Sequence, residues 1–145
     1  SLLASASVEV QTAIGEAGDR AGDLGQSNKV YYAMLRSVDE SVGRVLKALD
    51  DLRLADRTIV VFTSDNGGAV HFGQPPATSN YPLRDGKGTP YEGGLRVPLI
   101  VRAPGVTAPG SMCSLPVVTM DFFPTLLELL VRAVGVAIVV IFDVR

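Results

Sequence analysis

Residues 59–68, which read IVVFTSDNGG, constrain the fold of this chain more than any other stretch. An apolar run rich in β-branched residues is typical of a strand buried on both faces, and such strands belong to sheets covered by helices. Here the run ends abruptly in Asp65, Asn66 and two glycines. A strand that ends in this way delivers oxygen ligands to the edge of a sheet, where they can hold a metal ion or an oxyanion.

Length and composition place the chain among globular proteins. Its 145 residues, 47% hydrophobic and 19% charged, suffice for one domain with a core and exclude an intrinsically disordered chain. The net charge of −2, without any basic run, indicates no nucleic-acid partner. We expect no membrane span, because the uncharged apolar stretch 133–142 falls short of the roughly 20 residues required. The single cysteine, Cys113, has no histidine or basic residue close in sequence, and we interpret it as inert.

The spacing of apolar residues predicts an α/β fold with a sheet flanked by helices. The predicted helix and the buried strand that follows it form half of an α/β unit. Asn28 is a plausible N-cap of the first helix, and Asp121 of the second. The predicted organisation is an irregular N-terminal segment over 1–27, a helix from 28 to about 52, strands over 58–63 and 97–102, a helix over 121–130, and an atypical apolar, strand-like tail over 131–145.

A loop rich in glycine and proline, residues 64–96, follows the first predicted strand. So long a loop in a compact domain is usually functional or held by a ligand. Lys87 lies between two glycines within it, so a ligand can approach the backbone while the ammonium neutralises a sulfate or phosphate oxygen. A solvated loop lysine is the alternative. We interpret Glu92 and Arg96 as an ion pair that braces the loop.

Asp65 and Asn66 are the candidate metal ligands. Hard oxygen donors favour Ca²⁺ or Mg²⁺ over zinc, but Ca²⁺ takes six to eight oxygens, so further donors must come from elsewhere. The alternative is an ordinary turn after a strand. His71, the single histidine, is a candidate substrate contact, because an imidazole can donate, accept and carry a proton. An exposed loop histidine is an equally good interpretation.

Four motifs in order resemble the type I sulfatases, the arylsulfatase family of the alkaline-phosphatase-like superfamily. They read YYAMLRSVDESVGRVL at 31–46, FTSDNGG at 62–68, PLRDGKGTPYEGGLRVP at 82–98 and VTMDFFPTLL at 118–127. The resemblance covers roughly residues 28–130. It implies an α/β fold with a large mixed sheet, and hydrolysis of sulfate esters at a bound Ca²⁺, with Mg²⁺ less favoured.

The resemblance also implies roles for single residues. By matching position, Asp65 and Asn66 would be metal ligands, and Lys87 would bind the sulfate and stabilise charge on the transferring oxygens. Family members use a formylglycine, made within a Cys/Ser-x-Pro-Ser-Arg motif, as covalent nucleophile. That motif and the family's early aspartate pair do not occur in this sequence. We therefore expect residues 28–130 to be the C-terminal portion of a sulfatase catalytic domain, inactive without the N-terminal half that carries the formylglycine.

The expected partners are a sulfated small molecule or a sulfated glycan, and the missing N-terminal half of the domain. Two other hypotheses remain open from the sequence. One is a phosphoesterase or phosphonate hydrolase of the same superfamily, and the other is a non-catalytic binding module that keeps the fold. The resemblance suggests a periplasmic, extracellular or lysosomal location, although we recognise no targeting signal in the given sequence.

Overall fold

A three-stranded mixed sheet with one helix on each face forms the centre of the structure. The structure is a computed structural model that describes residues 28–71, 76–132 and 137–143. The strand order is β2-β1-β3, with β1 (Thr58–Ser64) in the middle. Strand β2 (Leu99–Arg102) runs antiparallel to β1, and β3 (Ala137–Asp143) runs parallel to it.

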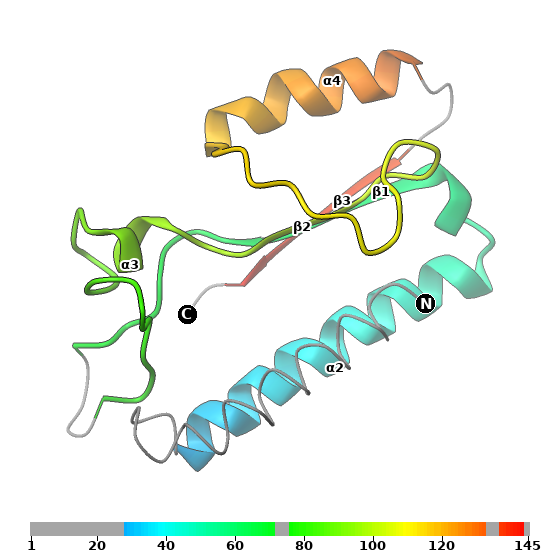
Figure 1. Cartoon of the computed structure of the whole chain (residues 1–145). Coiled ribbons are helices and arrows are strands. Elements are labelled where there is room, and N and C mark those ends of the chain that lie inside the picture. Colours follow the sequence, from blue (N-terminus) through cyan, green and yellow to red (C-terminus); the bar gives the residue numbers. More distant parts are fainter. Residues whose placement is uncertain (1–27, 72–75, 133–136, 144–145) are drawn as a thin grey trace.

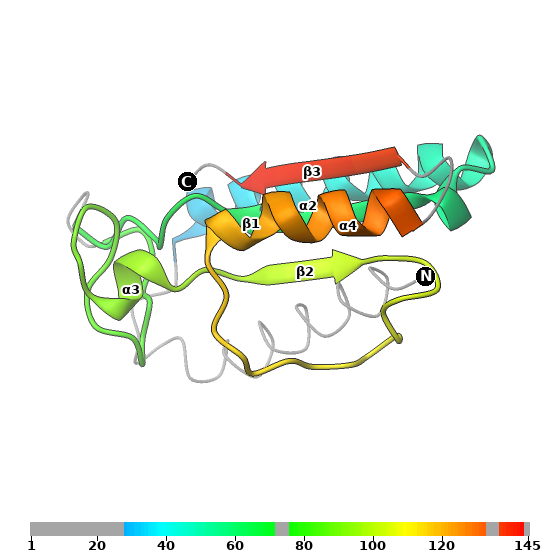
Figure 2. The same ribbon diagram turned by 90° about the horizontal axis from the view of Figure 1, so that it is seen from above.

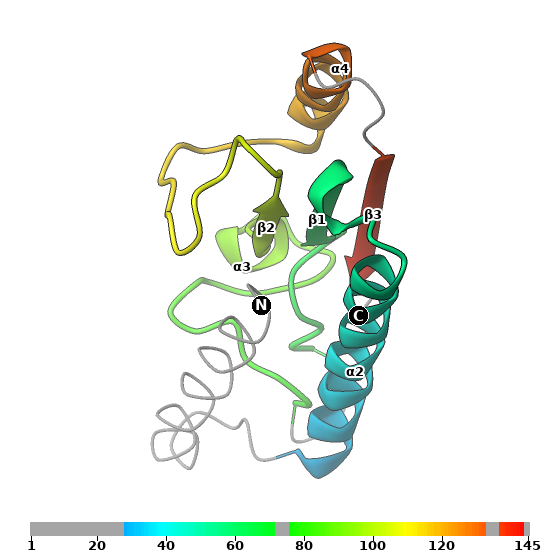
Figure 3. The same cartoon turned by 90° about the vertical axis from the view of Figure 1, so that its right-hand side faces the viewer.

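Helices α2 (Lys29–Asp51) and α4 (Phe122–Arg132) lie on opposite faces of this sheet, as Figures 1 and 3 show. The predicted α/β class, with a sheet flanked by helices, is therefore confirmed. None of the helices in the described ranges is both long and apolar enough to cross a membrane.

Helix α2 begins as the sequence predicts. The side-chain oxygen Oδ1 of Asn28 accepts a hydrogen bond from the Tyr31 amide at 3.1 Å, which satisfies one of the free donors of the first turn. Val42 and Leu49, seven residues apart and therefore on one face of the helix, are both buried. The helix thus forms because its apolar residues repeat at helical spacing, and its charged residues from Arg36 to Asp51 are exposed to solvent.

Strand β1 is buried on both faces, as its continuous apolar run predicts. Ile59 and Val61 are each 3% exposed and form a core with Ala103 and the apolar face of α4 (Phe122, Leu126 and Leu129). Val60 alternates to the opposite face, on which α2 lies (Figure 1). Each such side chain contributes about 1.5–3 kcal/mol when it is fully buried.

The structure differs from the prediction at the ends of several elements. Strand β2 begins at Leu99 rather than at residue 97, because Pro98 has no N–H to donate to a ladder. The carboxylate of Asp121 accepts from the Val118 amide at 2.8 Å, so this bond points back into the preceding 3₁₀ turn (Thr119–Asp121) and not into α4. The 3₁₀ turn Ala55–Arg57 and the short helix α3 (Glu92–Leu95) were not predicted.

The predicted apolar tail is partly described. Its residues Ala137–Asp143 form β3, which pairs with β1 along the whole length of both strands, from Thr58 opposite Ala137 to Ser64 opposite Asp143. The strand-like character of this part is confirmed. The predicted irregular segment 1–27, and tail residues 133–136 and 144–145, lie outside the described residues.

Candidate active site at the end of strand β1

The candidate metal ligands follow β1 directly, at the end of the sheet where the long loop and α3 gather (Figures 1 and 2). The Ser64 hydroxyl donates to the carbonyl of Asn66 at 2.9 Å, which fixes the turn after the strand. The side-chain amide of Asn66 donates to Oδ1 of Asp65 at 2.8 Å. The structure therefore places a carboxylate and a carboxamide side by side at the sheet edge, with Asp65 exposed and Asn66 half-buried.

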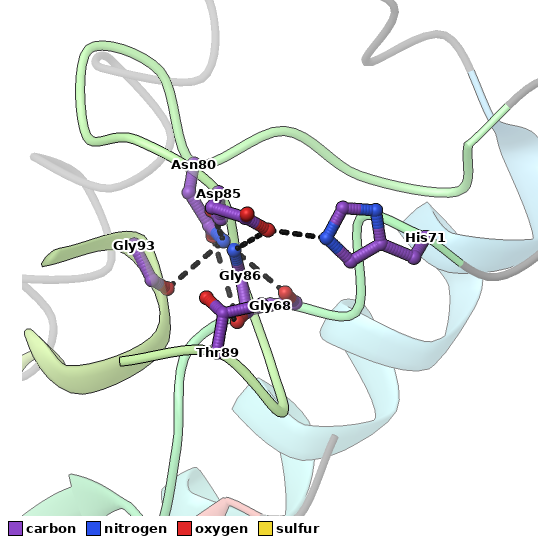
Figure 4. Close-up of polar contacts among 7 residues, drawn as sticks. All are labelled: Gly68, His71, Asn80, Asp85, Gly86, Thr89 and Gly93. Atoms are coloured by element: carbon purple, nitrogen blue, oxygen red, sulfur yellow. Dashed lines mark hydrogen bonds and ion pairs between the residues drawn. The ribbon is translucent and has the colours of Figure 1, made fainter. Parts of the chain in front are cut away.

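One side chain organises the loop around this edge. Figure 4 shows the amide of Asn80 among the backbones of Gly68, Asp85 and Gly93. Its oxygen Oδ1 accepts from the Gly68 N–H at 3.2 Å. Its nitrogen Nδ2 lies 3.1, 2.9 and 3.0 Å from the carbonyl oxygens of Gly68, Asp85 and Gly93, and because it carries two N–H groups, two of these carbonyls share one of them. We call the three backbone segments held by Asn80 the Asn80 cage.

The Asn80 cage brings Lys87 to the segment that carries Asp65 and Asn66. The Lys87 amide donates to the Gly68 carbonyl at 3.0 Å, and the Gly67 amide donates to the Gly94 carbonyl at 3.0 Å. The two motifs, about twenty residues apart in sequence, are thus joined by backbone hydrogen bonds. The Lys87 side chain is half-buried in this loop, which is more enclosed than a fully solvated lysine would be.

The glycines of the two motifs are required by contact between backbones. A Cβ atom at Gly67 would lie 1.6 Å from the Gly93 carbonyl oxygen, and one at Gly86 would lie 2.3 Å from the Gly68 carbonyl oxygen. The sequence predicted that glycine beside Lys87 lets a ligand approach the backbone. At Gly86 the structure shows a different reason, since the neighbour is another segment of the chain itself.

His71 lies outside the Asn80 cage, in contact with Asp85 (Figure 4). Its Nε2 pairs with Oδ1 of Asp85, which also accepts from the Gly86 amide at 2.8 Å. The hydrogen bond from His71 is the main reason that the pKa of Asp85 lies below its ordinary value. Desolvation, the next largest effect, opposes this lowering, and the hydrogen bond from the Gly86 amide adds to it. Asp85 adopts a left-handed conformation with φ of 67°, which Asp tolerates better than most residues. The imidazole of His71 is itself exposed.

Asn80 and Asp85 were not predicted from the sequence. Asn80 and Gly93 are thirteen residues apart, and no periodicity or motif predicts that one amide holds three carbonyls. The Arg84 guanidinium, 3.7 Å from the centroid of the Tyr91 ring, is a further unpredicted brace of this loop. The predicted pair of Glu92 and Arg96 does form, at 3.4 Å, but both side chains are exposed and the pair contributes little.

The donor set fits a hard cation in part. Asp65 and Asn66 supply one charged and one neutral oxygen donor, the types that Ca²⁺ accepts. Within the described residues no group of three or more His, Cys, Asp or Glu side chains is close enough to hold a metal ion. A cation at Asp65 and Asn66 would therefore need further donors, as the ligand count predicted. Cys113 is exposed and forms no disulfide.

The structure thus defines an α/β protein in which a buried strand ends in two oxygen donors, joined by backbone hydrogen bonds to a loop that carries a lysine. Comparison with known proteins identifies the class further. The model of the family described as Sulfatase matches residues 4–132. The chain belongs to the sulfatase family, which confirms the resemblance.

Characterised relatives carry the same family name. The chain is 48% identical over 108 residues to a sulfatase of Formosa agariphila, covering 68% of this chain and 19% of that protein. It is 45% identical over 103 residues to the steryl-sulfatase of Mus musculus, covering 68% and 16%. It is 40% identical over 107 residues to the human N-acetylgalactosamine-6-sulfatase, covering 73% and 20%. The matched region thus spans about a fifth of the length of these relatives.

The family match also begins before residue 28, where the resemblance was expected to begin. Its first part falls on residues outside the described ranges. The division into segments 1–27, 28–130 and 131–145 therefore stays a prediction.

Proposed function

We propose that this chain is part of the catalytic domain of a sulfuric ester hydrolase and contributes its metal- and sulfate-binding residues. Membership of the sulfatase family supports the reaction class. The observation that carries the residue assignment is the hydrogen bond from the Lys87 amide to the Gly68 carbonyl, because it joins the lysine loop to the segment that holds Asp65 and Asn66.

Asp65 and Asn66 are proposed to hold Ca²⁺ in preference to Mg²⁺. Ca²⁺ accepts a mixed set of carboxylate and amide oxygens in flexible geometry, whereas Mg²⁺ demands a near-ideal octahedron. The bound cation would neutralise charge on the sulfate oxygens. The hydrogen bond between the two side chains holds them next to each other at the sheet edge.

Lys87 is proposed to bind the sulfate group and to stabilise the charge that develops on its oxygens. Its ammonium would form a charge-assisted hydrogen bond to an oxygen of the ester. The Asn80 cage fixes the lysine backbone before substrate arrives, and such preorganisation is the main source of electrostatic catalysis. His71 is proposed as a further substrate contact, with its Nε2 oriented by Asp85.

The nucleophile is proposed to lie outside this chain. A formylglycine requires a Cys/Ser-x-Pro-Ser-Arg motif, and residues 113–117 read CSLPV instead. Cys113 is exposed and is not one of the residues that form the site described above. We therefore propose that the chain alone does not turn over a sulfate ester, and that an N-terminal half supplies the formylglycine and the remaining ligands.

The substrate is proposed to be a sulfated small molecule or a sulfated glycan. The relatives are named for a steroid and for an amino sugar, so their names do not choose between these classes.

The test uses the complete polypeptide that contains this sequence together with an N-terminal half, and the 145-residue chain alone as its control. Hydrolysis of an aryl sulfate and of the matching aryl phosphate is measured with added Ca²⁺ and with a chelator. We expect Ca²⁺-dependent hydrolysis that favours the sulfate in the complete polypeptide, and none in the chain alone. A preference for the phosphate, or turnover by the chain alone, would overturn the proposal.

A further inference from the structure

A pocket of about 330 Å³ opens beside the candidate active site. Its wall includes Asn80 and also Asp85, whose carbonyl belongs to the Asn80 cage. This volume is at the small end of the range for ligand pockets, which suits one ring rather than an extended chain. The pocket contains none of the residues assigned above to the metal or to sulfate.

The pocket lies close to Lys87. Only Gly86 separates Asp85 from Lys87, so the Cα atoms of these two residues are within about 7 Å of each other. The Asn80 amide holds the Asp85 carbonyl, and the Lys87 amide is bonded to Gly68 of the same cage. The pocket wall and the proposed sulfate contact are therefore parts of one rigid backbone network.

The lining has the chemistry of a site for hydroxyl groups. Val70, Pro76 and Leu83 supply apolar surface, and the ring of Tyr81 supplies an aromatic face. The hydroxyls of Thr78 and Ser79 supply donors and acceptors. The amide of Asn80 is already hydrogen-bonded to the backbone of the Asn80 cage, so we do not propose that it contacts a ligand in the pocket.

Asp85 gives this pocket its charge. Among the lining residues that the structure describes, it is the one ionisable group other than the tyrosine hydroxyl, and none of them is a lysine or an arginine. The hydrogen bonds from His71 and Gly86 both fall on Oδ1, so Oδ2 has no protein partner among the described residues. The nearest sequence neighbour with a positive charge, Arg84, stacks on the Tyr91 ring.

We infer that this pocket receives the alcohol part of the sulfate ester, and that Asp85 restricts it to an uncharged, hydroxyl-bearing group such as a single sugar ring. A carboxylate accepts hydrogen bonds from hydroxyl groups strongly, whereas a second sulfate or a carboxylate beside the scissile ester would face a like charge. This inference rests on the proposed sulfatase function, and it selects a monosulfated rather than a polyanionic substrate.

The test compares a monosulfated monosaccharide with the same sugar carrying a second, adjacent sulfate, and includes a small aryl sulfate. It uses the complete enzyme, wild type and Asp85→Asn. Asparagine tolerates the left-handed conformation and keeps an acceptor for the Gly86 amide, so the backbone is retained. Asp39→Asn, on the exposed side of α2, is the matched control for loss of one negative charge.

The wild type is expected to favour the monosulfated sugar at least tenfold in kcat/KM. Asp85→Asn is expected to narrow that ratio about tenfold, mainly through a lower KM for the disulfated sugar, and Asp39→Asn is expected to leave it unchanged. Turnover of all three esters without discrimination, or a ratio that Asp85→Asn does not move, would overturn the inference alone. No turnover of any sulfate ester would overturn the proposed function instead.

A second variant tests the pocket without touching its charge. Tyr81 is 70% exposed and therefore contributes little to the fold. We expect Tyr81→Leu to raise the KM for the monosulfated sugar several-fold, because the aromatic face is lost, and to leave kcat near the wild-type value. An unchanged KM would place the sugar outside this pocket.

Discussion

Asn80 and Gly68 are joined by two reciprocal hydrogen bonds, from the Gly68 amide to Oδ1 of Asn80 at 3.2 Å and from Nδ2 of Asn80 to the Gly68 carbonyl at 3.1 Å. The same Gly68 carbonyl accepts from the amide of Lys87. The position of the lysine backbone relative to the end of β1 therefore depends on an amide side chain that is not one of the residues proposed to bind the cation or the sulfate.

Replacing Asn80 is expected to loosen the whole loop. Asn80→Ala removes one accepted hydrogen bond and the two that its N–H groups donate, each with a net contribution of about 0.5–1.5 kcal/mol, so the free energy of unfolding should fall by roughly 1.5–4.5 kcal/mol. Amide hydrogen exchange at Lys87 and Gly93 should accelerate. Asn66→Ala, measured without divalent cations, is the control, since the side chain of Asn66 donates to Asp65 within its own turn. If amide exchange at Lys87 and Gly93 is unchanged in Asn80→Ala, the side chain of Asn80 does not hold these segments in place.

Adding a methyl group at Gly67 is expected to destabilise the fold strongly. The new Cβ would lie 1.6 Å from the Gly93 carbonyl oxygen, so one backbone segment must move, at a cost of about 1–3 kcal/mol or more. Gly43→Ala is the matched control, because nothing lies within 4 Å of its added Cβ and it occupies a helix interior. That change should stabilise by about 0.5–1 kcal/mol. Thermal unfolding of both variants distinguishes these outcomes.

The contact between His71 and Asp85 predicts a loss of stability in acid. The pKa of Asp85 is lowered in the folded chain, so its contribution is present above the ordinary carboxyl value, near 3.8. It is lost as the pH falls through the lowered value. Urea unfolding from about pH 6 to about pH 2 should show Asp85→Asn less stable than wild type at the higher pH, with the difference shrinking in acid. If the difference in unfolding free energy between the two proteins grows as the pH falls, the prediction is wrong.

The outer face of α4 is expected to cause self-association of the isolated chain. Phe123, Leu127 and Val131, spaced four residues apart, are 77%, 49% and 75% exposed and form an apolar stripe. Leu127→Lys should shift the sedimentation coefficient of the chain toward that of the monomer. Met112→Lys, at a residue that is 98% exposed but outside the stripe, should change it less. If the two changes shift the sedimentation coefficient equally, the apolar stripe of α4 is not the cause of self-association.

The sequence predicted the elements that depend on local patterning. The spacing of apolar residues gives α2 its buried face, and the continuous run at Ile59 to Val61 gives β1 its place in the middle of the sheet. The N-cap at Asn28 follows from residue type alone. The predicted start of β2 at residue 97 is wrong, because Pro98 has no backbone N–H and the strand begins only at Leu99.

Only part of the candidate site can be proposed from the sequence, for a physical reason. Asp65, Asn66 and Lys87 belong to short motifs whose chemistry is local, so the sequence alone singles them out. The Asn80 cage depends on contacts between residues twelve or more positions apart, such as that of Asn80 with Gly93. Those contacts require the loop to fold back on itself, and no periodic pattern encodes that path.

The central claim, that Asp65 and Lys87 act on one cation-bound oxyanion, is tested most directly by a double-mutant cycle. The measured quantity is kcat/KM for an aryl sulfate in the complete enzyme, for Asp65→Asn, Lys87→Ala and the double variant, with folding of each checked by circular dichroism. Each single change is predicted to lower kcat/KM at least about a hundredfold. The double variant is predicted to lie near the weaker single variant, because residues that act as a unit are not additive. Wild-type activity in either single variant, or effects that multiply in the double, would contradict the claim.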